Sequence, residues 1–287
     1  MARKLKIVLI SLGIIIVVLV AAGQIGSALW NKATVRAVAE LHRGRTSGEA
    51  KVFTGQELAG LPAPVARYLR MALKEGQRYI RSARIVQEGE LRLRQDDRRW
   101  SLFTAHQEFT VPPAGFVWDA RVRLLPILSA RIRDSYLAGR ASMRGKLFGF
   151  IPVVNASGTP NLAQGALQRY LAEMVWFPTA FLPGQGVTWT AVDDSRALAT
   201  LSDSGTTVSL EFQFNKRDEV AKVFTPGRYR QVGGDYVLTP WGGVHWNYEE
   251  RQGVRIPTGY VVVWYLPDGN FDWLKGLITD IRYEFEP

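Results

Sequence analysis

Apolar and polar residues alternate over much of the chain beyond residue 76. The alternation is clearest in residues 91–94, 116–123, 208–214 and 281–286. A period of two puts one set of side chains on a dry face and the other on a wet face, which predicts strands of an antiparallel sheet. The nearly continuous apolar run from Gly259 to Leu266 predicts a strand that is buried on both faces.

One long helix is predicted in the middle of these strands. Apolar residues recur at helical spacing from Leu162 to Val175, Asn161 can cap the start, and Pro178 ends the pattern. Shorter helical segments are predicted at Thr54–Gly60, where Thr54 and Glu57 fit a capping box, and at Val65–Leu73, Lys32–Leu41 and Phe271–Leu277.

Ten or more strands with only a few helices predict an α+β fold built on one large, curved antiparallel sheet. Such a sheet rarely stays flat, so we expect a half-barrel that wraps the central helix. A half-barrel closed by helices can leave an apolar interior that side chains do not fill. We therefore expect a cavity suited to a lipid or another apolar ligand.

The N-terminus predicts a membrane segment. Arg3, Lys4 and Lys6 precede an unbroken apolar run from Ile7 to Ala22, which with its flanks is long enough for a transmembrane helix. A cleaved signal peptide is the alternative, and both interpretations place the rest of the chain outside the cytosol. We expect a single-pass protein of the inner (cytoplasmic) membrane with a periplasmic C-terminal domain, and Trp30 at the membrane edge.

The predicted organisation has three parts. Residues 1–30 form the anchor or signal segment, residues 31–53 form a helical linker, and residues 54–287 form one β-rich domain.

Composition excludes several kinds of chemistry. The 287 residues include no cysteine and 3 histidines, so disulfides, thiolate metal sites and cysteine nucleophiles are excluded. Neither His106 nor His245 has a second ligand at metal-binding spacing, and no phosphate-loop, dinucleotide or serine-hydrolase motif occurs. We therefore expect no metal and no cofactor.

Charge is distributed unevenly. Residues 1–150 hold 25 Lys+Arg and 11 Asp+Glu, whereas residues 151–287 hold 11 and 15. This basic half either is a solvated surface or attracts an anionic partner. For an anchored protein the nearest anionic partner is the bilayer surface, and the membrane segment argues against nucleic acid. The candidate basic face consists of arginines at alternate strand positions: Arg92, Arg94, Arg121, Arg123, Arg131 and Arg133.

Several inward positions are candidates for ligand binding. Asp134 shares its parity with Ile132 and Tyr136, so its carboxylate should point inward, where it either pairs with a structural arginine or lines a pocket. Glu173 either forms an i,i+4 pair with Arg169 or lies at the mouth of the pocket. Large aromatic residues either fill the core or line the cavity. The candidate set is Trp118, Asp134, Tyr136, Glu173, Trp176 and Trp241.

Four stretches together resemble an uncharacterised bacterial family, known as a domain of unknown function, whose members often carry N-terminal membrane segments. The resemblance covers roughly residues 55 to 285, and no activity is attached to that family. The order of strands and helices is also similar to that of the periplasmic lipoprotein carriers, although no carrier motif is present. The stretches are Leu61-Pro62-Ala63-Pro64-Val65 with Arg67-Tyr68-Leu69-Arg70, residues 115–120, residues 169–178, and Pro240-Trp241 with Arg255-Ile256-Pro257.

Three functions fit these observations. The first is an envelope protein that binds a lipid or another apolar molecule in its half-barrel. The second is a scaffold or assembly factor whose basic face holds an acidic envelope protein or an anionic lipid. The third is an enzyme that uses Asp119, Asp134 or Glu173 as acid or base.

Overall fold

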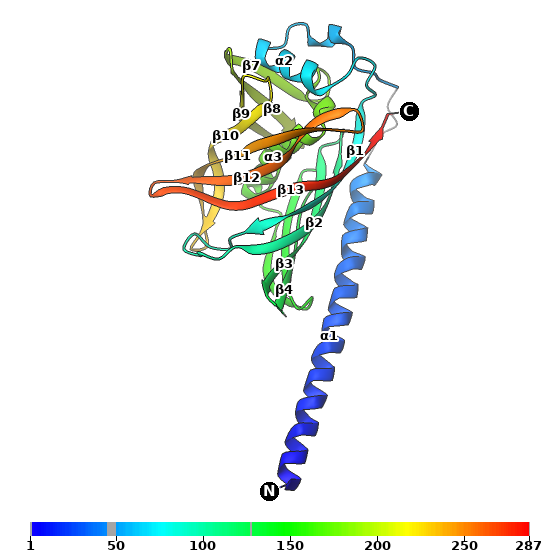
Figure 1. Ribbon diagram of the computed structural model, residues 1–287, viewed down its shortest axis with the longest axis vertical. Helices are drawn as coiled ribbons and strands as arrows, with labels where there is room; N and C mark the ends of the chain where they lie inside the picture. Colours follow the sequence, from blue (N-terminus) through cyan, green and yellow to red (C-terminus); the bar gives the residue numbers. More distant parts are fainter. Residues whose placement is uncertain (1, 45–49, 127, 287) are drawn as a thin grey trace.

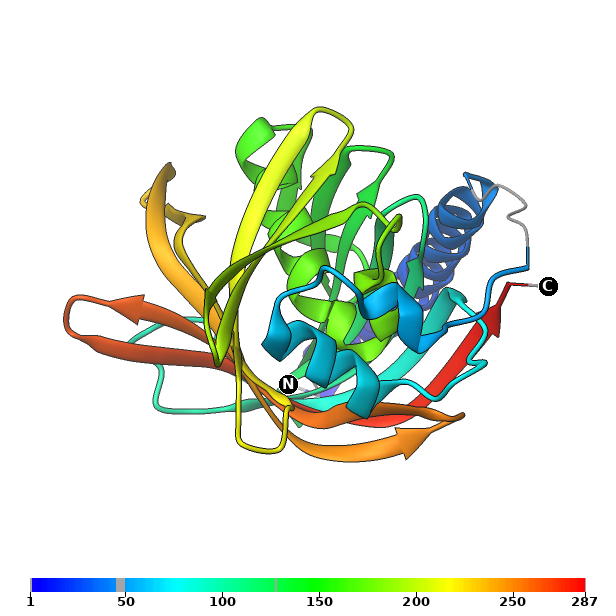
Figure 2. The ribbon, with the colours of Figure 1, turned by 90° about the horizontal axis from the view of Figure 1, so that it is seen from above.

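A single antiparallel sheet of 13 strands forms the body of the molecule. The computed structural model describes residues 2–44, 50–126 and 128–286. The sheet curves strongly around the helices in its interior (Figures 1 and 2), which confirms the predicted α+β half-barrel. The strands are β1 (Ile80–Leu91), β2 (Ser101–Thr110), β3 (Gly115–Leu125), β4 (Leu128–Leu137), β5 (Arg140–Leu147), β6 (Ile151–Ser157), β7 (Val187–Asp193), β8 (Arg196–Asp203), β9 (Thr206–Phe214), β10 (Val220–Val232), β11 (Asp235–Arg251), β12 (Val254–Leu266) and β13 (Gly269–Phe285).

The strand order shows how one continuous sheet forms the half-barrel. It runs β6-β5-β4-β3-β2-β1-β13-β12-β11-β10-β9-β8-β7, so nearly every pair is a hairpin and β1 joins β13. Strands β6 and β7 are therefore the two free edges, and the helix α3 lies between them in the chain. The helices are α1 (Ala2–Arg43), η1 (Gly55–Leu58), α2 (Ala63–Ala72), α3 (Pro160–Glu173), η2 (Met174–Trp176) and η3 (Pro178–Phe181).

The helix α3 is the central helix that the sequence predicts, and it contacts strands from both halves of the sheet. Its continuation through η2 and η3 fills much of the interior with aromatic rings. The ring of Phe109 lies 4.7 Å from that of Phe177, and Trp176 lies 5.1 Å from Tyr260 between centroids. This part of the half-barrel is therefore packed rather than vacant.

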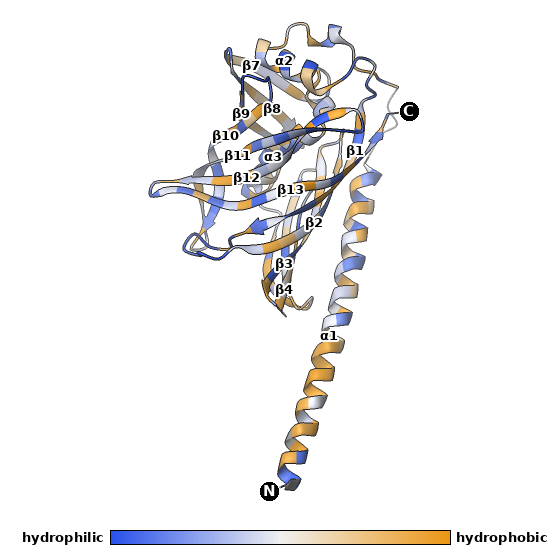
Figure 3. Cartoon of the chain, in the orientation of Figure 1, coloured by the Kyte–Doolittle hydropathy of each residue, from blue (hydrophilic) through white to orange (hydrophobic). Residues whose placement is uncertain are grey.

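The helix α1 is one continuous helix of 42 residues, where the sequence suggested an anchor followed by a separate helical linker. Its N-terminal half is apolar and exposed (Figure 3), and by length and composition the helix can cross a membrane. Its C-terminal half packs on the outer face of β2, β3 and β4. Residues 45–49 of the expected linker lie outside the described residues.

Two local predictions are wrong. The segment Phe271–Leu277 is not a helix but part of β13. The cap of α3 is Thr159 rather than Asn161, because the Oγ1 atom of Thr159 accepts a hydrogen bond from the backbone N–H of Leu162 (3.2 Å). Pro160 at the first helical position suits this arrangement, since its missing N–H needs no partner there.

The cap assignment can be tested with a pair of alanine variants. We expect Thr159→Ala to lower the free energy of unfolding by about 1 kcal/mol, because a backbone donor of α3 loses its acceptor. Asn161→Ala should change this free energy by less than about 0.5 kcal/mol. Denaturant unfolding of the full chain in detergent, followed by tryptophan fluorescence, measures both; a larger loss for Asn161→Ala contradicts the assignment.

Candidate functional site

A polar cluster lies inside the half-barrel where α3 faces β2, β4 and β10. Its charged members are Arg169 and Glu173 of α3, Asp134 of β4 and Arg228 of β10. The i,i+4 spacing on α3 brings the first two together. The alternation along β4 turns Asp134 inward, as the sequence predicts, and this residue is buried.

A continuous chain of hydrogen bonds joins these groups to the sheet. The guanidinium of Arg169 donates to Asp134 (Nη1 to Oδ2, 2.8 Å) and to Glu173 (Nε to Oε1, 2.8 Å). Gln107 of β2 donates to the other carboxylate oxygen of Glu173 (2.8 Å). Gln87 donates to Gln107 (2.9 Å) and accepts from the indole N–H of Trp118 (2.8 Å). Every step therefore pairs a donor with an acceptor, as buried polar groups require.

Burial and charge oppose each other at this cluster. Burial raises the pKa of Glu173, although Arg169 and Gln107 act in the opposite direction. Burial alone would lower the pKa of Arg169, but the carboxylates of Glu173 and Asp134 raise it above its ordinary value. The guanidinium carbon of Arg169 also lies 5.0 Å from the ring of Phe116 and 5.1 Å from that of Trp118. Arg169 is thus the central cation of the cluster.

Arg228 is the second interior cation and has a different environment. It lies 4.1 Å from the ring of Trp241 and 5.9 Å from that of Trp264. Among the described residues, no carboxylate comes within ion-pair distance of Arg228. Burial lowers the pKa of Arg228 to about 10, and the nearby Asp134 and Glu173 only partly offset this effect. It stays charged at neutral pH without a bound anion.

The remaining candidate ligand residues are deeply buried. Tyr136 donates from its hydroxyl group to Asp203 (2.7 Å) at the turn between β8 and β9. Trp176 packs against Phe109 and Tyr260. The indole N–H groups of Trp176 and Trp241 have no partner among the described residues. The structure therefore brings Trp118, Asp134 and Glu173 into one cluster, with Trp241 beside it under Arg228.

The candidate basic face divides into separate parts. Four of its arginines lie on the neighbouring strands β3 and β4, where Arg121 faces Arg131 and Asp119 faces Arg133. The other two lie elsewhere. Arg92 donates to the backbone carbonyl of Asp272 (2.6 Å), and Arg94 pairs with Asp96 (3.2 Å).

The C-terminal half of α1 covers part of this face. Asp119 is buried beneath α1. Its carboxylate accepts hydrogen bonds from the indole N–H of Trp30 (3.0 Å), the hydroxyl of Thr34 (2.6 Å) and the guanidinium of Arg131 (3.0 Å). Trp30 is 3 % exposed, because Asp119 draws its indole onto the sheet; its place at the membrane edge stays a prediction.

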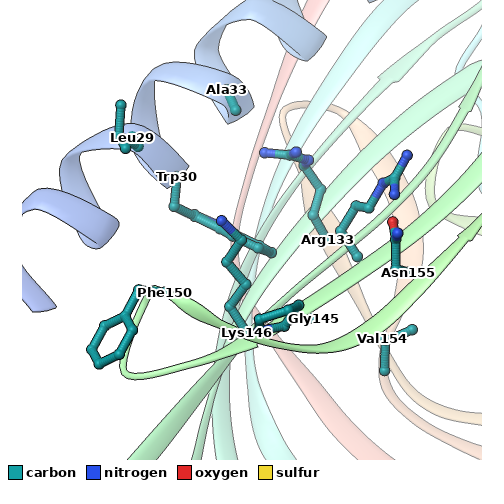
Figure 4. A pocket seen from close by; sticks show the side chains of 11 residues that line it. Leu29, Trp30, Ala33, Arg133, Gly145, Lys146, Phe150, Val154 and Asn155 are labelled. Carbon is teal, nitrogen blue, oxygen red and sulfur yellow. The ribbon is translucent and has the colours of Figure 1, made fainter. Parts of the chain in front are cut away.

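Two cavities open on the outer surface of the half-barrel. One, of about 390 Å³, lies between α1 and the strands β4, β5 and β6 (Figure 4). The other, of about 750 Å³, lies over β1, β2, β3 and β13 beside the turn between β3 and β4. Arg133 lines the first, and Arg121 and Arg123 line the second. These cavities are thus lined by members of the basic face, whereas the predicted ligand residues lie inside.

The part of the chain that the structure describes contains no group of three or more His, Asp or Glu residues that could hold a metal ion. His245 is buried on β11, which lowers its pKa to about 4 and keeps the ring neutral at physiological pH. Asp134 and Glu173 converge on Arg169, whereas Asp119 lies on the opposite face of the sheet. The three carboxylates named for acid–base chemistry therefore do not form one site.

Sequence reasoning did not assign Arg228 or Gln107 to the interior site. Both lie on strands whose alternation could have indicated an inward position. What alternation does not show is that β2 and β10 face the same helix from opposite sides of the half-barrel.

The chain was compared with known proteins. The model of a family of unknown function (DUF6920) matches residues 59–283. The chain matches no curated protein. A solved LolA superfamily protein from Nitrosomonas europaea is similar over 82 % of this chain and 96 % of its own, with 11 % identity and a TM-score of 0.39. A β-barrel-like protein of the domain of unknown function DUF1849 from Brucella abortus is similar over 72 % and 99 %, with 10 % identity and a TM-score of 0.23.

The family match confirms the predicted membership of a family of unknown function. At these identities and TM-scores, the two solved structures say nothing about the function of this chain.

Replacing the central cation tests the interior cluster. We expect Arg169→Met to lower the free energy of unfolding by about 3–5 kcal/mol, because Asp134 and Glu173 become buried charges without a partner. The triple variant Arg169→Met, Asp134→Asn, Glu173→Gln should recover much of this loss, because it removes those charges.

Denaturant unfolding of the full chain in detergent measures the effect. If Arg169→Met does not fold, the yields of folded protein are compared between the single and the triple variant instead. A single variant as stable as the native protein, or a triple variant no better than the single one, contradicts a buried, coupled cluster.

Proposed function

The chain belongs to the DUF6920 family of unknown function, and we propose that it is a membrane-anchored envelope protein whose half-barrel binds an amphipathic, lipid-like molecule. The proposed molecule has an anionic group, which pairs with Arg228, and an apolar body, which lies against the interior tryptophans. In this proposal α1 spans the inner membrane once and the half-barrel lies on its periplasmic side.

Arg228 is the observation that carries the proposal. Its guanidinium lies among aromatic rings inside the half-barrel, and no carboxylate of the described residues pairs with it. Arg228 is partly withdrawn from water, which costs free energy for a cation without an ion pair, and a bound anion offsets that cost. Arginine also suits this role because its planar guanidinium donates two parallel hydrogen bonds to a carboxylate or phosphate.

The surroundings of Arg228 favour an anion that carries an apolar group. Trp241 and Trp264 flank the guanidinium, and Gly165 of α3 presents only backbone toward it: a Cβ atom there would lie 3.5 Å from Nε of Arg228. Arg228 and Trp264 both stay partly exposed. These two side chains therefore keep some contact with solvent, in contrast to the packed rings around Phe109.

The anchor supports the same proposal. The apolar half of α1 is wholly exposed, which is costly in water and favourable in a bilayer. Because the other half of α1 is bonded to the sheet through Asp119, the half-barrel stays next to the membrane that contains its ligand.

Ligand retention by the full chain tests the proposal. The protein is extracted in a mild non-ionic detergent, and native mass spectrometry identifies retained lipids. We expect an anionic amphiphile to be retained, with affinity lowered about 10- to 100-fold in Arg228→Gln, since a charged hydrogen bond contributes roughly 1.5–3 kcal/mol.

Arg140→Gln is the matched control, because it also removes one arginine but at an exposed position at the start of β5. Native protein that retains no amphiphile contradicts the proposal. Equal retention by Arg228→Gln and Arg140→Gln contradicts the role of Arg228.

A further inference from the structure

The smaller of the two outer cavities is a crevice between α1 and the hairpin of β5 and β6. Its volume is about 390 Å³. In Figure 4, Trp30 of α1 faces Arg133 and Lys146 of the sheet across the crevice. Arg144 and Asn155 also line it, and none of its lining residues is acidic. The crevice is therefore electropositive.

The basic side chains of the crevice repel one another. In the register of β4 and β5, Arg133 lies directly opposite Arg144, and Arg131 lies directly opposite Lys146. Like charges at directly opposed positions of a sheet are unfavourable. Burial lowers the pKa of Arg133; the carboxylate of Asp119 acts against this effect, and Arg144 and Arg131 add to it.

The carboxylate nearest to these cations is already engaged. Asp119 accepts hydrogen bonds from Trp30, Thr34 and Arg131. Among the described residues, no carboxylate forms an ion pair with Arg133, Arg144 or Lys146. Arg133 donates instead to the neutral hydroxyl of Thr34 (2.9 Å). Three cations thus line the crevice, and the nearby carboxylate of Asp119, which lies opposite Arg133, is shared with Arg131.

The crevice lies close to the C-terminal end of the apolar run of α1. That run ends at Ala22, and the turn between β5 and β6 contacts α1 at Gly23 and Gly26. A Cβ atom on Gly26 would lie 2.6 Å from the carbonyl oxygen of Gly149, so only glycine permits this approach. At 1.5 Å per residue, Gly26 is about 6 Å along the helix axis from Ala22.

The hairpin at this level has the composition of a membrane-contacting element. Phe148, Ile151 and Val153 are 49 %, 42 % and 50 % exposed. Exposed aromatic and aliphatic side chains next to basic ones are typical of segments that lie in the interface of a bilayer. The headgroups of the surrounding lipids would thus lie at the height of the crevice.

We propose that this crevice binds the phosphate-bearing headgroup of an anionic membrane lipid. Arg133, Arg144 and Lys146 supply the charge, and the amide of Asn155 supplies a neutral donor. The acyl chains follow the apolar surface of Leu29, which is exposed, and of Phe150, which is partly exposed, into the bilayer. The inference rests on the proposed membrane anchoring of α1 and is independent of a ligand in the half-barrel interior.

Lipid retention by the full chain tests this site. The probe is phosphatidylglycerol, with phosphatidylcholine as the uncharged comparison, added to the detergent-purified protein and followed by native mass spectrometry. Arg144→Gln with Lys146→Gln should weaken phosphatidylglycerol binding about 25-fold, given roughly a fivefold effect for each basic residue near an anionic lipid. The native protein should prefer phosphatidylglycerol to phosphatidylcholine.

The matched control is Arg70→Gln with Lys216→Gln. It removes the same charge from exposed positions at the end of the domain away from the N-terminus of α1, and it should bind like the native protein. Unfolding midpoints of both double variants are measured, and the crevice variant should be no less stable than the native protein, because it removes cross-strand repulsion.

Three results would overturn the inference. They are equal binding by the two double variants, no preference for phosphatidylglycerol in the native protein, and inorganic phosphate alone displacing the lipid, which would indicate a site for free phosphate. Failure of the interior site has a different signature: Arg228→Gln then behaves like Arg140→Gln, while the crevice variant still loses phosphatidylglycerol.

Discussion

The carboxylate of Asp119 organises the contact between α1 and the half-barrel. It is buried at the surface where α1 meets β3 and accepts hydrogen bonds from Trp30, Thr34 and Arg131. A buried carboxylate without donors would be costly. The hydrogen bonds from Trp30 and Thr34 therefore stabilise both the buried carboxylate and the contact between α1 and the sheet. The position of the domain relative to the apolar run, and hence both proposed binding sites, depends on this contact.

The interior and the crevice share one feature, a cation that forms no ion pair with the described residues. In the interior, two cations balance two carboxylates: Arg169 pairs with both Asp134 and Glu173, whereas Arg228 forms no ion pair with the described residues. At the crevice, Asp119 pairs with Arg131, which leaves Arg133, Arg144 and Lys146. In each case a cation that forms no ion pair with the described residues lies beside an apolar surface, which suits an amphipathic anion better than an uncharged apolar molecule.

Much of the fold could be predicted from the sequence. Alternation identified the strands because each has one dry face, and the 3.6-residue pattern identified α3 because that helix packs inside the sheet. The helix prediction for Phe271–Leu277 is wrong because β13 contains a bulge. Val262 pairs with Leu274, but Val263 pairs with Asp272, so Trp273 is an extra residue. One extra residue breaks the period of two and makes the spacing resemble that of a helix.

The sites were less predictable, for a different reason. Alternation places Asp119 outward and Asp134 inward, which agrees with the structure. It does not indicate what covers each face. The cover of Asp119 comes from a helix 85–89 residues away in sequence, and the partner of Asp134 comes from one 35 residues away. Local patterns carry no information about such distant contacts. The burial of Trp30, and the lack of an ion pair between Arg228 and the other described residues, therefore emerge only from the structure.

The distance between α1 and the half-barrel tests the central claim most directly. The chain contains no cysteine, so spin labels can be placed at Val35→Cys and Val153→Cys, two exposed positions on the helix and on β6. Pulsed electron paramagnetic resonance on the membrane-reconstituted chain should give one narrow distance distribution, which broadens when Asp119→Ala is added. A distribution that is already broad with Asp119 in place would contradict a fixed anchor.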